Sequence, residues 1–490
     1  MSRMAEPAPE NTLGILDMDV TALIDQLQSR SLTSVEAVKT CIKHLEHANP
    51  KVNCLVENRF GEALEEAKEA DRLLESGKAS GALTGVPISM KESFDVSGMK
   101  TTGGLKHRAG AVAQNDAEVV AALKKEGAII LGKTNTPALC FCQETDNKLF
   151  GKTNNPWDLN KTAGGSSGGE GALIAVGGAA AGIGSDIGGS IRFPSHFNGV
   201  VGFKSGNGQV SDTGSFPDIV HPIQKRMLGI GPMAKSVRDV RLIYSLISTQ
   251  QKSPSAKLSD ITIHKLPANT YPLGESSGRM IQKIADYLNQ TFWVGIEIPP
   301  YFQESAIIWQ EIMSVDGGRS VADTAGFRGH GEVVKEYVKE TLLKRSDYHY
   351  YLTWALIGAK MFKPSQKRIL EIEKVIEKGD EIISDYFENK ILLLPVYHRT
   401  APPHGKLYSE LFSVKKTFKK FMPYVAYANV WGLPSLTVPA GKDENGMPIG
   451  VQLVSKSGNE ERLFALGELI EAEFGGYVRC TAHDQEKDRS

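Results

Sequence analysis

The sequence predicts an α/β fold, in which helices cover a central sheet. Short apolar segments typical of buried strands, VPISM ending at Met90 and AIIL ending at Leu131, alternate with stretches whose apolar residues recur at helical spacing. Strand-like segments return near Ile391 and Ser435, and the amphipathic EERLFALGELIEAEF follows them. Alternation of strands and helices is typical of layered α/β proteins.

Each predicted helix has a local signal. Thr33 and Glu36 form a capping-box pattern directly before VEAVKTCIKHLEHA, so we expect a helix to begin there. Further helices are expected over residues 62–75 and 118–126. The segment 274–385 is charged and mostly helical in pattern, and we expect it to be a substrate-side insertion on the sheet. The last strands would then rejoin the first sheet.

The composition excludes several protein classes. The 490 residues hold 56 Lys plus Arg and 57 Asp plus Glu, a net charge of −1, which argues against a nucleic-acid-binding protein. Five scattered cysteines suggest a reducing, cytoplasmic setting without disulfides or structural zinc. No apolar segment is long enough for a transmembrane span, and the acidic amino terminus does not look like a signal peptide. Without repeats or linkers, residues 1–490 are predicted to form a single domain.

One motif suggests nucleotide binding. Residues 127–134 match the phosphate-loop pattern G-x-x-x-x-G-K-[ST]. That loop must follow a strand and open a helix, whereas here the apolar AIIL lies inside the pattern and Pro137 follows soon after. A buried strand turning out of the sheet is therefore the preferred interpretation.

A second motif suggests a hydrolase with a Ser-His-Asp triad. Residues 164–168 match G-x-S-x-G, with Ser166 as the nucleophile. The pattern requires a buried strand just before the serine, but a polar loop precedes it. His398, His404 and His483 are the late histidines that could serve as base, and each is expected to be an ordinary surface or packing residue.

The third motif is the longest and runs over residues 163–208. Two serine-bearing glycine loops, GGSSGG and DIGGS, flank a segment of only small and aliphatic residues. Glycine costs up to about 1 kcal/mol relative to alanine inside a helix, so this density suggests that backbone must lie close to a ligand. A close-packed helix between flexible turns remains an alternative.

The segment 163–208 resembles the core signature of the amidase signature family. GVPISMKES around Lys91, GKTNTP, GLPSLTVPAG and GVQLVS also resemble that family, so most of the chain is covered. The resemblance implies the amidase signature fold, an α/β/α sandwich with a large mixed twisted central sheet covered by helices. It implies neither a cofactor nor a metal.

The resemblance also implies roles for individual residues. Ser190 would be the nucleophile, Ser166 a bridging serine in a cis peptide, and Lys91 the base. The oxyanion hole would be formed by the backbone amides of Ile187, Gly188, Gly189 and Ser190. Supporting residues would be Asp186 and Arg192. Ser167 is of the right type to assist by hydrogen bonding, with the capping of a turn as the alternative. Substrate-binding residues would be Cys140, Phe141 and Phe193.

This chemistry requires an uncharged lysine. A serine hydroxyl becomes a good nucleophile only when a base takes its proton, and Lys91 can do so only when neutral. The apolar residues before it are consistent with the burial that would lower its pKa. Taken without the resemblance, Lys91 paired with Glu92 at a strand end is the simpler interpretation.

The expected function is hydrolysis of linear carboxamides, fatty or aryl, through an acyl-enzyme. Glu170, Ile187 and Phe193 are most similar to the fatty acid amide hydrolase subgroup, whereas amidotransferase subunits more often have Thr and Gln at the last two positions. A carbamate (urethane) or ester hydrolase, a non-enzymatic binding protein and a glutamine-dependent amidotransferase subunit remain alternatives. The expected partner is a small-molecule amide, ester or carbamate, and a homodimer is left open.

An aromatic cluster lies in the segment 274–385. We hypothesise that it lines an acyl channel; ordinary core packing is the alternative, because aromatic stripes are usually core. Its members are Tyr348, Tyr350, Tyr351, Trp354 and Phe362.

Overall fold

Eleven strands form one mixed sheet within the residues that the computed structural model describes, 12–250, 258–412 and 417–485. The strand order is β1-β3-β2-β6-β8-β7-β12-β13-β11-β9-β10. The strands are β1 Leu55–Asn58, β2 Pro87–Lys91, β3 Ile129–Thr134, β6 Ala181–Asp186, β7 Val201–Lys204, β8 Gly229–Ala234, β9 Thr262–Lys265, β10 Val294–Ile296, β11 Lys390–Pro395, β12 Ser435–Lys442 and β13 Pro448–Val454. A separate two-stranded sheet pairs β4 Asn154–Asn155 with β5 Asp158–Thr162.

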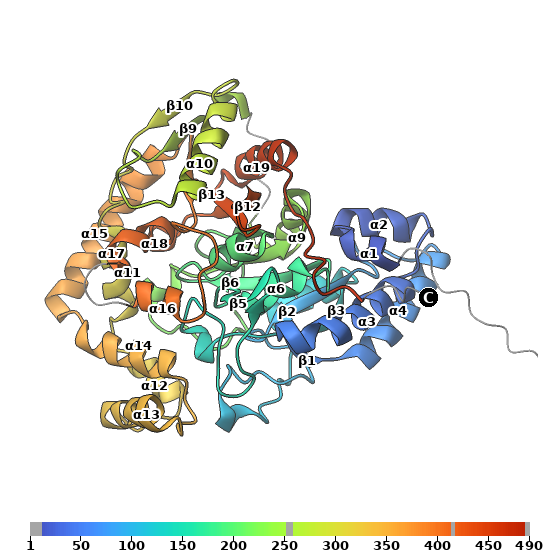
Figure 1. The fold of residues 1–490 in the computed structure, drawn as a ribbon, viewed down its shortest axis with the longest axis horizontal. Coiled ribbons are helices and arrows are strands. Elements are labelled where there is room, and N and C mark those ends of the chain that lie inside the picture. The colour runs from blue at the N-terminus through green and yellow to red at the C-terminus, as the bar shows by residue number, and fades with distance from the viewer. Residues whose placement is uncertain (1–11, 251–257, 413–416, 486–490) are drawn as a thin grey trace, which may run out of the picture.

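Helices surround this sheet (Figure 1), and the predicted α/β fold is confirmed. In the first half they are α1 Thr12–Asp17, α2 Val20–Gln28, α3 Ser34–Val52, α4 Phe60–Glu75, α5 Glu118–Lys125, α6 Gly168–Ala175, α7 Arg192–Asn198, α8 Pro222–Lys225 and α9 Val237–Ile247. In the second half they are α10 Glu275–Leu288, α11 Ser305–Met313, α12 Arg319–Thr324, α13 His330–Leu343, α14 Tyr350–Met361, α15 Gln366–Tyr386, α16 Lys406–Leu411, α17 Phe418–Phe421, α18 Pro423–Val430 and α19 Glu460–Phe474. Short 3₁₀ turns are η1 Lys106–Arg108, η2 Ala138–Cys140 and η3 Leu258–Asp260.

The central strands are buried along their whole length. Every residue of β2, β3, β6, β7 and β8 is buried, which is expected where helices cover both faces of a sheet. β2 and β6 run parallel, with Met90 opposite Ile183. Their carboxyl ends therefore meet at one edge, and this edge carries the candidate site.

Local signals set several element boundaries as predicted. Thr33 Oγ1 accepts a hydrogen bond from the Glu36 amide, and Glu36 Oε2 accepts one from the Thr33 amide, so the capping box at the start of α3 is formed. The phosphate-loop pattern does not form a loop. Lys133 and Thr134 lie inside β3, where they pair with β1 and β2.

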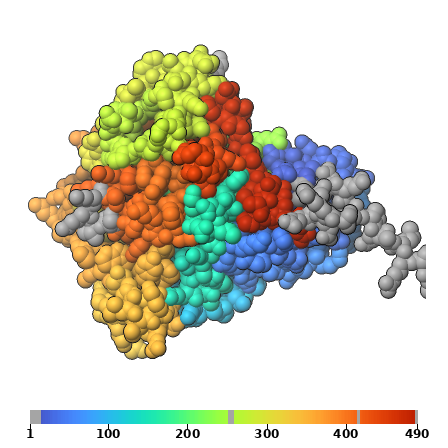
Figure 2. Space-filling view, in the orientation of Figure 1, coloured from blue at the N-terminus to red at the C-terminus, as the bar shows by residue number. Residues whose placement is uncertain are grey.

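The segment 274–385 contains α10 to α15 and the edge strand β10. α10 packs near β11 and β13, whereas α13 packs on α14, and α14 contacts η2. Figure 1 places α12, α13 and α14 together at one end of the molecule, and Figure 2 shows them as an amber projection. In the described part of the chain, no helix combines the length and apolar character needed to cross a membrane.

Candidate active site

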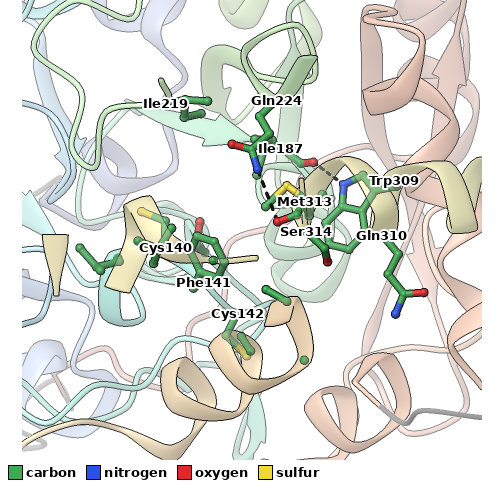
Figure 3. A pocket seen from close by; sticks show the side chains of 18 of the residues that line it. Cys140, Phe141, Cys142, Ile187, Ile219, Gln224, Trp309, Gln310, Met313 and Ser314 are labelled. Carbon is green, nitrogen blue, oxygen red and sulfur yellow. Dashed lines mark hydrogen bonds between the residues drawn. The ribbon is translucent and has the colours of Figure 1, made fainter. Parts of the chain in front are cut away.

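A cavity of about 210 Å³ lies at the carboxyl edge of β2 and β6. Ser166, Ser185 and Ser190 line one part of it. Much of the remaining wall is apolar and includes Phe141, Phe216, Trp309, Met313, Trp354 and Phe362. In Figure 3, Cys140 and Phe141 lie on one side of this cavity, and Trp309 and Met313 lie on the other. A polar group of serines is thus joined to an apolar space.

Lys91 is the last residue of β2 and has no exposed surface. Its Nζ donates hydrogen bonds to Ser166 Oγ at 2.6 Å and to Ser185 Oγ at 2.9 Å. Burial lowers the pKa of Lys91 from its ordinary value, and this effect outweighs the nearby Cys140, Asp186 and Glu170, which act to raise it. The structure therefore provides the desolvated lysine that the chemistry requires.

Ser166 lies in the loop between β5 and α6, and the Gly165–Ser166 peptide bond is cis. A Cβ on Gly165 would lie 2.8 Å from the backbone of Gln143 and Glu144, so only glycine fits there. Ser167 connects this loop to the next one. Its amide donates to Ser190 O at 3.1 Å, and its hydroxyl donates to Ser185 O at 3.4 Å.

Ser190 lies in the tight turn between β6 and α7 and is 4% exposed. Within the described residues its hydroxyl has no hydrogen-bond partner, and no hydrogen bond joins it to Ser166. The three residues predicted as a catalytic triad are thus brought to one place, with the bond between Lys91 and Ser166 already formed. A G-x-S-x-G elbow with a histidine base is not formed, because His398, His404 and His483 bond instead to Glu410, Leu159 O and Pro156 O.

The turn before Ser190 has its carbonyl groups anchored. Asp186 O accepts a hydrogen bond from Asn429 Nδ2 at 3.3 Å, and Ile187 O accepts one from Trp309 Nε1 at 2.7 Å. Gly188 O accepts from Gln143 Nε2 at 3.2 Å, and Gly189 O accepts from the Phe193 amide at 2.8 Å. Among the described residues, no acceptor is found for the amides of Ile187, Gly188 and Ser190. Free amides beside a cavity that contains a serine suit an oxyanion hole.

The predicted role of Gly189 needs a correction. Its amide donates to Asp186 Oδ1 at 2.8 Å, so it is occupied rather than free. The reason is the tightness of the turn, in which the carboxylate that ends β6 folds back onto the amides following it. Asp186 also accepts from the Ile191 amide at 3.1 Å.

Asp186 and Arg192 form a fully buried ion pair. Arg192 donates from Nε and Nη2 to the two carboxylate oxygens, each at 3.0 Å. Burial alone would raise the pKa of Asp186, but the Arg192 guanidinium holds it below its usual range. The ion pair therefore fixes a charged carboxylate, which in turn shapes the turn that carries Ser190.

Of the three residues predicted to bind substrate, two line the cavity and one does not. Cys140 and Phe141 line the cavity, but Phe193 does not. Phe193 is fully buried, and its ring centroid lies 5.9 Å from that of Phe197 and 5.5 Å from that of Tyr397. Its ring also packs against Gly189, where a Cβ would lie 2.5 Å from Phe193 Cε2.

Only part of the predicted aromatic cluster lines the cavity. Trp354 and Phe362 line the cavity. Tyr348 packs on Phe327 instead, and Tyr350 and Tyr351 pack around Tyr408.

Several site residues were not predicted. Ser185 could have been found, because it directly precedes Asp186 in the signature. In the sequence, Glu170 was noted only for its similarity to the fatty acid amide hydrolases. In the structure its fully buried carboxyl group accepts hydrogen bonds from Ser89 Oγ at 2.5 Å and from Thr134 Oγ1 at 2.9 Å. Burial raises the pKa of Glu170 to about 8. Gln143 and Trp309 carry no local signal in the sequence.

A buried lysine bonded to a serine, beside a second serine and an apolar cavity, is suited to an enzyme that transfers acyl groups. Residues 36–464 match the family described as Amidase, and the chain belongs to this amidase signature family, as the sequence resemblance predicted. It is an amide-hydrolysing enzyme of that family.

Curated relatives agree with this assignment. The chain is 32% identical to fatty-acid amide hydrolase 2-B of Danio rerio and 30% identical to fatty-acid amide hydrolase 2 of Homo sapiens, covering 96% and 97% of this chain and 92% of each relative. It is 28% identical to a glutamyl-tRNA(Gln) amidotransferase subunit from Lachnospira eligens, over 95% of this chain and 100% of the relative.

Solved structures show the same fold. The structure of 6-aminohexanoate cyclic dimer hydrolase complexed with substrate superposes with a TM-score of 0.78 at 23% identity, covering 96% of this chain and all of that one. A fatty acid amide hydrolase structure also gives 0.78 at 23% identity, covering 97% of this chain and 87% of the other.

Proposed function

We propose that this enzyme hydrolyses linear carboxamides with apolar acyl groups through an acyl-enzyme on Ser190. The observation that carries the proposal is the completely buried Lys91, 2.6 Å from Ser166 Oγ, at a cavity that Ser190 also lines. The largely apolar wall supports an apolar acyl group, fatty or aryl.

The proton route follows from this arrangement. Ser190 Oγ bonds to the carbonyl carbon while its proton passes to Ser166, whose own proton passes to the neutral Lys91 Nζ. The amides of Ile187 and Gly188 would stabilise the negative oxygen of the tetrahedral intermediate. When the C–N bond breaks, the proton returns along the same route to the leaving amine. Water then cleaves the acyl ester, releasing the carboxylic acid and restoring the Ser190 hydroxyl.

Carbamates and esters are the alternative substrates, because the same groups can attack any acyl carbon that reaches Ser190. The amidotransferase alternative requires partner chains, and similarity to a glutamyl-tRNA(Gln) amidotransferase keeps it in the test. Robust amide hydrolysis by the purified chain alone would exclude an obligatory complex.

The test is an activity screen of the purified chain with amides, esters and carbamates of increasing acyl length. We expect amide hydrolysis that Ser190→Ala abolishes and Ser245→Ala, on the exposed face of α9, leaves unchanged. Trp354→Ala should change the dependence on acyl length, because Trp354 lines the cavity. Absence of turnover with every substrate class, or full activity in Ser190→Ala, would refute the proposal.

A further inference from the structure

Trp309 reaches the Ser190 turn from a distant part of the chain. It lies on α11, and its Nε1 donates a hydrogen bond of 2.7 Å to the carbonyl oxygen of Ile187 (Figure 3). The indole ring also covers the next residue closely, since a Cβ on Gly188 would lie 2.7 Å from Trp309 Cζ2. One side chain thus holds the turn by a hydrogen bond and by ring contact.

The bonded carbonyl belongs to the peptide that carries a predicted oxyanion donor. Ile187 O and Gly188 N are part of one peptide unit, and only the Gly165–Ser166 and Phe216–Pro217 bonds are cis within the described residues. In a trans peptide the C=O and N–H point in opposite directions, so holding the oxygen fixes the direction of the N–H. That N–H has no acceptor in the described part of the chain.

We propose that Trp309 is a positioning residue of the oxyanion hole. By donating a hydrogen bond to the Ile187 carbonyl, it orients the Gly188 amide. This inference rests on the proposed function and names a residue that controls its rate. Trp309 also lines the cavity. Contact between the acyl group and the indole ring would therefore bear on the peptide that must stabilise the oxyanion.

α11 is itself held in place. Gln224 Nε2 donates to Ile312 O at 3.1 Å, and the Trp309 ring packs near that of Phe418, with centroids 6.3 Å apart. The indole therefore has a fixed position from which to orient the peptide.

Trp309→Phe tests the inference by removing the N–H while keeping an aromatic ring. Losing a whole oxyanion donor costs about 10²–10³-fold in kcat, so loss of orientation at one donor should lower kcat about 10-fold. KM for a short amide should stay within about twofold of the wild-type value, because ground-state binding does not use the oxyanion hole. Inhibition by a trifluoromethyl ketone, whose adduct with Ser190 carries an oxyanion, should weaken by a similar factor.

A matched control is available in Trp157→Phe. Trp157 Nε1 also donates to a backbone carbonyl, that of Asn198 at 2.9 Å, but Trp157 does not line the cavity. We expect kcat and ketone inhibition to remain at wild-type values in this variant. A second replacement of Trp309, by 3-benzothienylalanine, keeps the bicyclic shape without the N–H and should repeat the loss of kcat even if Trp309→Phe fails to fold.

The outcomes separate this inference from the proposed function. If the wild-type chain turns over no substrate, the proposed function fails. If the wild type is active and the benzothienylalanine protein keeps the wild-type kcat, with or without a change in KM, the positioning role of Trp309 is overturned while the proposed function stands.

Discussion

Replacing Lys91 by methionine removes the amine of the proposed proton route while keeping a side chain of similar length. A general acid or base is worth about 10²–10⁴-fold in rate, and here one amine acts in both directions. We therefore expect kcat for an amide to fall at least about 10³-fold, equivalent to about 4 kcal/mol of activation free energy. The loss should be smaller for an ester, since its leaving alkoxide needs the returned proton less than an amine does.

Lys133→Met is the matched control for this experiment. Lys133 is equally buried, lies on the neighbouring strand β3, and donates to Thr101 Oγ1 at 2.8 Å instead of to the serines. Both variants remove a buried lysine from adjacent strands, so both report on stability, but only Lys91→Met should lower kcat by this factor. Equal activity in Lys91→Met and wild type would refute the proposed proton route.

The pH profile of the wild-type enzyme provides the second readout on Lys91. Its neutral form is the active one, and burial lowers its pKa, so kcat/KM should rise with pH through that lowered pKa and reach a plateau. The acidic limb should be missing from the residual activity of Lys91→Met. An identical acidic limb in both proteins would assign that limb to another group.

Three further changes test the surroundings of the site. Burial raises the pKa of Glu170 from an ordinary 4.5 to about 8, so the wild-type protein loses stability as pH rises through that range. Measured by urea unfolding, the free energy of unfolding of Glu170→Gln should therefore rise relative to wild type by on the order of a few kcal/mol between pH 5 and 9. A difference that stays constant with pH would contradict the raised pKa. Arg192→Met leaves a buried carboxylate unpaired and should lower the free energy of unfolding by about 3–5 kcal/mol; wild-type stability would show that the ion pair is dispensable. Gly165→Ala should displace the Ser166 loop and abolish amidase activity, whereas Gly110→Ala, with no atom within 4 Å of its new Cβ, should behave as wild type; an active Gly165→Ala would contradict the tight packing.

The parts of the site that could be predicted from the sequence are those carried by contiguous motifs. Ser166 and Ser190 lie in one segment, and Lys91 ends a strand whose apolar pattern is plain. β3 extends beyond the predicted Leu131 because Gly132, Lys133 and Thr134 still pair with their neighbours. Strand pairing of this kind depends on partners far away in the sequence.

Two differences between the prediction and the structure have physical causes. The resemblance implied a substrate-binding role for Phe193, but the helical spacing of Phe193 and Phe197 turns both rings toward Tyr397. Trp309 could not be predicted, because only tertiary packing brings α11 to the turn after β6. A single tryptophan in a helix is usually a core residue, and its hydrogen bond to Ile187 O is visible only in three dimensions.

Covalent labelling locates the nucleophile most directly. The purified chain would be treated with a fluorophosphonate, digested, and the modified peptide sequenced by mass spectrometry. We predict stoichiometric labelling at Ser190, loss of activity in proportion to labelling, and protection by an amide substrate. Label on Ser166 or Ser185, or none at all in an active enzyme, would contradict the acyl-enzyme proposed here.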